Sequence, residues 1–256
     1  MNTSKKTLVA LALTCLAPFA AYSQSEGGLL LSAGAEKKID KKMSVDIEAT
    51  FRTRNDFKTL DRWSGGVGID YKLTKWLKAD AAYNLLYDNN REKITYNYAA
   101  DGSATGYNNW RPSYWGLRHR LKASLTFDHK VWGDIRLSLR ERWQYTYRPE
   151  KETERWDFDN SKWETKMRSG RGKNMLRSRL QVEFDKKGLK IKPYVNIEFY
   201  NKMAIEKIRY TVGADFKLTK QHSFGAFYRY QQAKNTDPDD YEPNMHYLGL
   251  DYKFKF

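Results

Sequence analysis

Cysteine is almost missing from this 256-residue chain, and the single one, Cys15, lies in an apolar N-terminal segment. If that segment is removed, no thiol remains, which excludes disulfide bonds and cysteine nucleophiles. The four histidines, His119, His129, His222 and His246, are dispersed and have no spacing typical of a metal site. A glycine-rich phosphate-binding loop is missing too. We therefore expect neither a cofactor nor a metal ion.

Long apolar runs are also scarce. The longest, Thr7–Ala21, follows two lysines and leads into small residues, which is the order of parts in a secretory signal. It is shorter than the about 20 residues that a spanning helix needs. We expect residues 1–23 to be a signal peptide cleaved near Ser23-Gln24, and residues 24–256 to form a single domain.

Acidic residues are outnumbered in the expected mature chain. Removing the two signal lysines from 46 basic residues leaves 44 against 31 acidic ones, a net charge of +13. Such a balance ordinarily suggests a nucleic-acid partner. Here the charges alternate with apolar residues and do not form one block, and export separates the chain from nucleic acid. We expect no nucleic-acid partner.

Apolar residues instead recur at every second position. At the end of the chain, His246, Leu248, Leu250, Tyr252, Phe254 and Phe256 alternate with Tyr247, Gly249, Asp251, Lys253 and Lys255. A period of two places these sets on opposite faces of a strand. The pattern, with its final Phe256, resembles the terminal strand of Gram-negative outer-membrane barrels. That resemblance implies an outer-membrane location and contact with the barrel-assembly machinery through this strand.

Ten further segments alternate in the same way and have the length of about 10 residues that crosses a bilayer when tilted. With the last segment, they are Leu29–Lys38, Met43–Arg54, Trp63–Leu73, Leu77–Tyr87, Tyr114–Phe127, Ile135–Tyr147, Met175–Phe184, Ile191–Tyr200, Ile208–Leu218, Phe224–Tyr230 and His246–Phe256. The sequence predicts an all-β fold, an antiparallel up-and-down transmembrane β-barrel of 10–12 strands. A soluble sandwich is the alternative, but charged residues face large aromatics along successive hairpins without sandwich corners.

Short and long connections alternate between these segments. The longest, about residues 88–113 and 148–174, are expected to be extracellular loops, and the short turns to be periplasmic. Eleven segments conflict with the even number that bacterial barrels normally have. The first would also run toward the short-turn side, so that it begins outside.

A short motif recurs at the ends of three segments. It reads Gly-x-Asp-aromatic-Lys in Gly68–Leu73, Gly213–Leu218 and Gly249–Phe254. Together with the Glu36–Lys42 turn and the terminal Phe256, the motif resembles an uncharacterised family of outer-membrane barrels, known only as a domain of unknown function. The resemblance covers the mature chain and implies the barrel fold, but it supplies no substrate.

Charged residues fill the face that would line the lumen. The expected inward cations are Arg118, Arg120, Lys122, Arg136, Arg140, Arg142, Arg177 and Arg179. The expected inward acids are Asp46, Glu48, Asp70, Asp80, Glu183, Glu198, Asp215 and Asp251. Two interpretations remain open. Ion pairs can fill a narrow interior, or the seven arginines can line a path for anions, because guanidinium groups suit carboxylate and phosphate.

Two polar residues break the pattern on the lipid-facing side. His119 and Glu141 fall on the outward phase of neighbouring strands, and we expect them to lie within side-chain reach if the intervening turn closes tightly. Ser178 has the same phase, which raises the alternative of a lipid-facing hydrolase similar to lipid A deacylases. The expected strand order places serine too far from histidine for proton transfer.

An acidic loop near the C-terminus could hold Ca²⁺ through Asp237, Asp239, Asp240 and Glu242, although a solvated loop explains it more simply. We expect a barrel without catalytic activity. Its expected partners are outer-membrane lipid and lipopolysaccharide, and its oligomeric state stays open.

Overall fold

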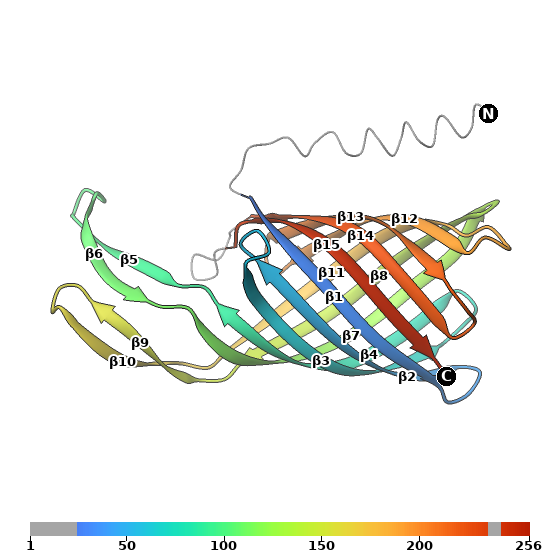
Figure 1. Cartoon of the computed structure of the whole chain (residues 1–256), viewed down its shortest axis with the longest axis horizontal. Coiled ribbons are helices and arrows are strands. Elements are labelled where there is room, and N and C mark those ends of the chain that lie inside the picture. The colour runs from blue at the N-terminus through green and yellow to red at the C-terminus, as the bar shows by residue number, and fades with distance from the viewer. Residues whose placement is uncertain (1–24, 235–241) are drawn as a thin grey trace, which may run out of the picture.

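The computed structural model describes residues 25–234 and 242–256, which form fifteen strands (Figure 1). The expected signal cleavage site lies outside these residues, as do Asp237, Asp239 and Asp240. The strands are β1 (Ser25–Lys38), β2 (Met43–Arg54), β3 (Thr59–Lys72), β4 (Leu77–Asn90), β5 (Lys93–Tyr98), β6 (Ala104–Arg111), β7 (Tyr114–Trp132), β8 (Ile135–Arg148), β9 (Lys151–Asp157), β10 (Lys162–Arg168), β11 (Arg171–Phe184), β12 (Ile191–Asn201), β13 (Ile205–Lys217), β14 (His222–Ala233) and β15 (Asn244–Lys255).

Eleven of the described strands close into a barrel in the order β1-β15-β14-β13-β12-β11-β8-β7-β4-β3-β2. The predicted barrel, its strand count and all eleven spanning segments are confirmed. Neighbouring strands are antiparallel except β1 and β15, which run parallel from Ser25↔Asn244 to Glu36↔Lys255. An odd number of up-and-down strands can close only with one parallel pair, so the conflict over strand parity is resolved in this way.

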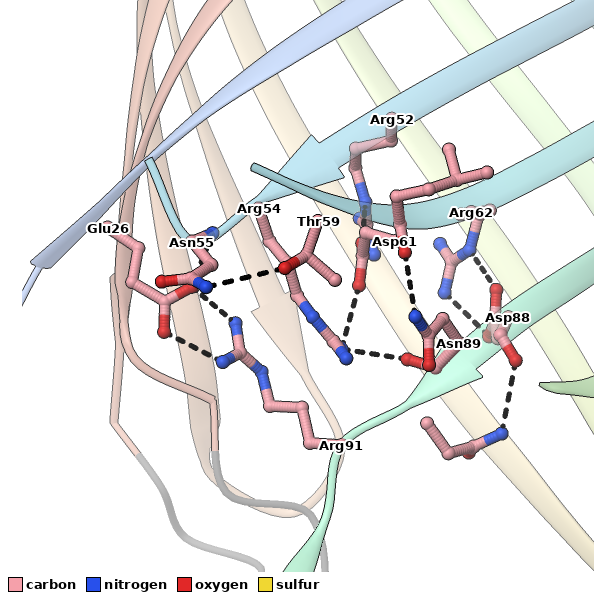
Figure 2. A network of polar contacts seen from close by, with 12 residues as sticks. Glu26, Arg52, Arg54, Asn55, Thr59, Asp61, Arg62, Asp88, Asn89 and Arg91 are labelled. Carbon is pink, nitrogen blue, oxygen red and sulfur yellow. Dashed lines mark hydrogen bonds and ion pairs between the residues drawn. The ribbon is translucent and has the colours of Figure 1, made fainter. Parts of the chain in front are cut away.

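Strand β1 is held by side-chain contacts at both of its ends. At the end that carries the short turns (the turn end), Glu36 accepts contacts from Lys253 at 2.8 Å and Lys255 at 3.3 Å. At the opposite end, both guanidinium NH groups of Arg91 donate to Glu26 at 2.7 Å (Figure 2). The backbone N–H of Asn55 also donates to Glu26, at 3.0 Å. These contacts hold the first residues of β1 against the barrel.

The barrel is apolar outside and polar inside. Large exposed side chains on its outer wall include Ile47, Val67, Ile69, Leu85, Leu117, Leu121, Leu125, Leu139, Leu180, Val195, Val212, Leu248 and Leu250. The buried residues are largely polar and include Asp61, Asp88, Ser124, Gln144, Glu198, Thr211 and Gln231. In the described part of the chain, no helix is long and apolar enough to cross a membrane. The alternating face pattern therefore matches a wall between lipid and a polar lumen.

The two long connections, for which the sequence predicted loops and no strands, contain further strands. They form β5, β6, β9 and β10, a four-stranded sheet with the order β10-β9-β6-β5, which projects from one end of the barrel (Figure 1). This sheet, here called the tongue, repeats the order β11-β8-β7-β4 of the strands it continues. The register also continues across each break, from Arg148↔Arg171 to Lys151↔Arg168. The tongue is thus an extension of one side of the barrel wall.

Glycine is required near the start of β1. A Cβ on Gly28 would lie 2.4 Å from the backbone oxygen of Thr53 and 2.9 Å from the Tyr247 ring. Gly65, on β3, has nothing within 4 Å of the same position. Because a backbone atom cannot rotate away as a side chain can, an added methyl group at Gly28 must displace β1 from β2.

We predict that Gly28→Ala lowers the free energy of unfolding by about 1–3 kcal/mol, the usual cost of overpacking. Urea titration of the protein folded into lipid vesicles would measure the loss. Gly65→Ala serves as the matched control and should leave the midpoint nearly unchanged. Equal urea midpoints for the two variants would contradict the close approach of β1 to β2 at Gly28.

Candidate functional site: the barrel lumen

One cavity of about 1010 Å³ occupies the lumen. Its lining extends from Arg148 and Arg168 at the tongue end to Lys38 and Lys255 at the turn end. Twenty lysine and arginine residues line it, against six aspartate and glutamate residues. The excess positive charge of the sequence is therefore concentrated inside the barrel.

The seven arginines predicted to face the lumen divide into two groups. Arg118, Arg120, Arg142 and Arg177 line the cavity. Arg136, Arg140 and Arg179 are absent from its lining. Arg140 bonds to a buried carboxylate, and Arg179 pairs in register with Glu198 and Arg140 on either side. Lining the cavity and forming an ion pair do not exclude each other, because Arg118 and Arg177 line it and also pair with Asp88 and Glu198.

Arg136 belongs to a cluster at the turn end. It lies 2.8 Å from Asp185 and 3.2 Å from Asp128. Asp185 also lies 2.6 Å from Lys192, and that hydrogen bond lowers the pKa of its carboxyl group, with further lowering from the nearby Arg136 and Lys130 charges. The cluster ties the turn after β11 to β8 and β12.

Glu198 is the central buried carboxylate of the β8–β12 wall, with 5% of its surface exposed. It accepts from Arg140 at 2.6 Å, from Arg177 at 2.9 Å and from the Tyr200 hydroxyl at 3.0 Å. The Arg177 guanidinium also lies over the Tyr200 ring, 4.5 Å from its centroid. One acid therefore compensates two buried cations.

The same arrangement occurs twice more near the tongue end, on β2, β3, β4 and β7, and Figure 2 shows the part on β2 to β4. Asp61 bonds to Arg52 and, at 3.1 Å, to Arg54. Asp88 lies 2.8 Å from an Arg62 NH group and 2.9 Å from Arg118. Both carboxylates are buried, so each again serves two guanidinium groups in a poorly solvated site.

Other cations in the cavity lining have no acidic partner. Arg120 donates to the Thr146 hydroxyl at 3.1 Å and Arg229 to the Thr211 hydroxyl at 3.2 Å. Within residues 25–234 and 242–256, neither of them nor Lys122 forms an ion pair with a carboxylate. These three side chains therefore leave positive charge in the cavity that no carboxylate of the described residues pairs with.

Acidic residues gather in the turn half of the lumen. Asp70 pairs in register with Asp80, and Asp251 lies two strands from Asp215 across Gly225. With Asp46, these residues form an acidic arc over β13, β15 and β2 to β4. The cations of β7, β8 and β11 (Arg118, Arg120, Lys122, Arg142 and Arg177) form the cationic wall. The acidic arc and the cationic wall lie on different strands, although Arg209, Lys217 and Lys253 also line the cavity on strands of the arc.

The expected contact between His119 and Glu141 is wrong. His119 pairs with Tyr147, whereas Glu141 pairs with Leu125, six positions away on β7 (125 − 119), or about 20 Å at about 3.3 Å per residue. The hairpin reverses at Gly133, where φ is +53°, and not near residue 130 as tight pairing required. His119 bonds instead to the Tyr83 hydroxyl at 2.7 Å.

Glu141 has a different partner on the outer wall. The Ser178 hydroxyl donates to it at 2.7 Å, so the carboxylate facing lipid is hydrogen bonded. Glu141 on β8 is thus hydrogen bonded to Ser178 on β11. His119 lies on β7, opposite Tyr147 and far along the strand from both residues. His119 is therefore too far from Ser178 to take its proton.

We predict that Ser178→Ala and His119→Ala leave the lipid A and phospholipid composition of producing cells unchanged, because the two residues do not form a catalytic pair. Mass spectrometry of extracted lipids would test this. Cells without the protein provide the reference. An acyl-chain difference that appears with the wild type and disappears in both variants would contradict it.

Glu242 is the one member of the acidic loop that the structure describes. It accepts from Lys207 at 2.6 Å and from Gln231 at 3.0 Å and lines the cavity. Among the described residues, no group of three or more His, Cys, Asp and Glu side chains could hold a metal ion. The contact with Lys207 ties Glu242 to β13 of the barrel wall.

Residues 27–242 match the family described as "Protein of unknown function (DUF2490)". The chain belongs to this family. No curated protein matches the DUF2490 chain. Among solved structures, it is similar to the translocator domain of autotransporter NalP from Neisseria meningitidis, with a TM-score of 0.52, 11% identity and 91% of each chain covered.

Two further outer-membrane structures are less similar to the DUF2490 barrel. The beta domain of the Bordetella autotransporter BrkA gives a TM-score of 0.47 at 12% identity, covering 75% of this chain and 76% of that one. The CymD monoaromatic hydrocarbon channel gives 0.40 at 8% identity, covering 77% and 66%. The likeness to NalP supports the outer-membrane barrel fold alone.

We predict that Glu198→Gln destabilises the barrel by about 3–5 kcal/mol, because it leaves two buried guanidinium groups without a counter-charge. The urea midpoint of the vesicle-folded protein would show the loss. Glu152→Gln, at an exposed position of the tongue, should change stability by no more than about 0.5 kcal/mol. A similar effect of both changes would disprove the role of Glu198.

Proposed function

We propose that this protein is a non-catalytic outer-membrane barrel that provides a narrow, anion-preferring conduit. The observation that carries the proposal is the lining of the lumen, where twenty basic residues face six acidic ones. Charged residues around a pore set the sign of the ions that enter it. The class of solute is a small anion with carboxylate or phosphate groups, which guanidinium groups bind well.

The proposed orientation places the turn end in the periplasm and the tongue outside the cell, as in other barrels with short periplasmic turns. The apolar outer wall then contacts membrane lipid and lipopolysaccharide. In this orientation β15 ends on the periplasmic side, where barrel-assembly machinery would engage it.

The cavity supports a conduit in preference to a solid plug. Its lining includes residues from both ends of the barrel, and its volume is about 1010 Å³. Spread over the about 30 Å of a bilayer core, this volume corresponds to a cross-section on the order of 30 Å². Such a path accommodates small ions and excludes folded chains.

The cationic wall determines the preference within this path. Arg120 and Lys122 lie two positions apart on β7, so both face the lumen, and neither has an acidic partner. An anion that enters from the tongue end meets Arg148 and Arg171 first and then these two residues.

We predict anion-selective current from the purified protein in a planar bilayer under a KCl gradient. Arg120→Ala/Lys122→Ala should shift the reversal potential toward cation preference, because it removes two uncompensated charges from the path. Lys41→Ala/Lys75→Ala changes the same net charge at exposed short turns and is the matched control.

The control variant should keep the wild-type reversal potential. Cation preference of the wild type, or the absence of current from correctly folded protein, would refute the conduit. Equal shifts in both double variants would refute the assignment of selectivity to the cationic wall.

A further inference from the structure

The tongue carries an aromatic face on an otherwise polar sheet. Ile94, Trp110, Trp156 and Trp163 pair directly across β5, β6, β9 and β10, and directly paired residues share a face. The Trp163 ring lies 5.7 Å from that of Trp110 and 5.6 Å from that of Trp156. The four side chains form one row across the sheet.

A second aromatic row lies farther from the barrel on the same face. Tyr96 pairs with Tyr107, and their ring centroids are 5.4 Å apart. The Tyr107 ring is also 5.3 Å from that of Phe158, which lies two residues beyond Trp156. The two rows together make a platform of adjoining rings, called here the aromatic platform.

On the tongue the aromatic side chains are more exposed than the polar ones, the reverse of a sheet in a soluble protein. Tyr107 is 54% exposed and Trp163 52%, whereas Thr95, Asn97 and Thr153 on the opposite, polar face are only partly exposed. A contiguous exposed apolar patch of this kind marks an interaction surface.

The platform is on the outer side of the wall. Polar-face residues at the base of the tongue contact the Tyr114 ring: Arg111 is 5.5 Å from its centroid, and Lys151 and Arg168 are each 5.8 Å away. Arg168 also lines the lumen cavity. The polar face therefore continues the lumen side, and the platform continues the lipid-facing side, where Tyr87 and Trp115 stack at 4.9 Å.

Two carboxylates border the platform. Glu92 accepts from the Trp110 indole N–H at 3.2 Å, and Glu154 lies two residues before Trp156 on the same face. Carboxylates facing acyl chains are costly, which argues against a lipid occupant. A second copy of this chain would bring the same acidic groups into contact. Sugars fit, because their C–H faces stack on aromatic rings and their hydroxyl groups donate hydrogen bonds to carboxylates.

We propose that the aromatic platform binds the saccharide chains of the surrounding lipopolysaccharide. The layer that lies directly above the lipid outside this wall is made of those sugars, and the platform continues the lipid-facing wall into it. The proposal rests on the outer-membrane placement of the barrel and is independent of conduction.

The test uses the full-length protein in detergent and the lipid-free core oligosaccharide released from lipopolysaccharide by mild acid. Calorimetry should show binding by the wild type and at least a tenfold loss in Tyr107→Ala/Trp163→Ala. Thr153→Ala/Lys166→Ala, on the polar face of the tongue, should bind as the wild type does. The far-ultraviolet circular dichroism spectrum of each variant reports an intact barrel.

Retained affinity in the platform variant would overturn the proposal, as would no binding by the wild type. Binding to phospholipid vesicles but not to the oligosaccharide would assign the platform to lipid instead. A dimer that dissociates on Tyr107→Ala/Trp163→Ala would assign it to self-association. Normal conductance without sugar binding would disprove this inference and leave the conduit intact.

Discussion

The sharing of a few buried carboxylates among more arginines is the interaction on which the interior depends. Asp61, Asp88 and Glu198 each hold two guanidinium groups. An isolated buried charge would cost several kcal/mol, whereas a shared acid satisfies two at once and fixes both geometrically. Because each acid serves two bases, the wall remains positive after its internal pairing. Sharing one carboxylate between two arginines therefore stabilises the barrel and also leaves a net positive charge in its lumen.

The repeated Gly-x-Asp-aromatic-Lys motif places a glycine and an aspartate on the lumen face. Gly213 and Gly249 flank Phe227 on the two neighbouring strands, and a Cβ on Gly249 would lie 2.0 Å from the Phe227 ring. The glycines make room for a large inward side chain, and the aspartate two residues later belongs to the acidic arc. The motif therefore describes a lumen that must fit both a bulky ring and a carboxylate in adjacent layers.

The spanning strands could be predicted because lipid on one side and charge on the other impose a period of two on local sequence. The residue pairs between strands could not be predicted, because the register depends on where each hairpin reverses. The reversal of the β7–β8 hairpin near Gly133 places His119 opposite Tyr147 and away from Glu141. Arg140 and Glu198 are 58 residues apart, and their contact requires β11 between them. The tongue was missed because its breaks obscure the alternation, although Trp110, Trp156 and Trp163 follow it.

The single parallel ladder has a mechanical consequence. Parallel strands pair slightly less strongly per residue than antiparallel ones, so the cylinder is not equally strong around its circumference. Ten of its strand pairs are antiparallel, and the parallel β1–β15 pair is weaker. If the wall is pulled apart, it opens first between β1 and β15, where the ion pairs of Glu36 with Lys253 and Lys255 cross the weaker pair of strands at the turn end.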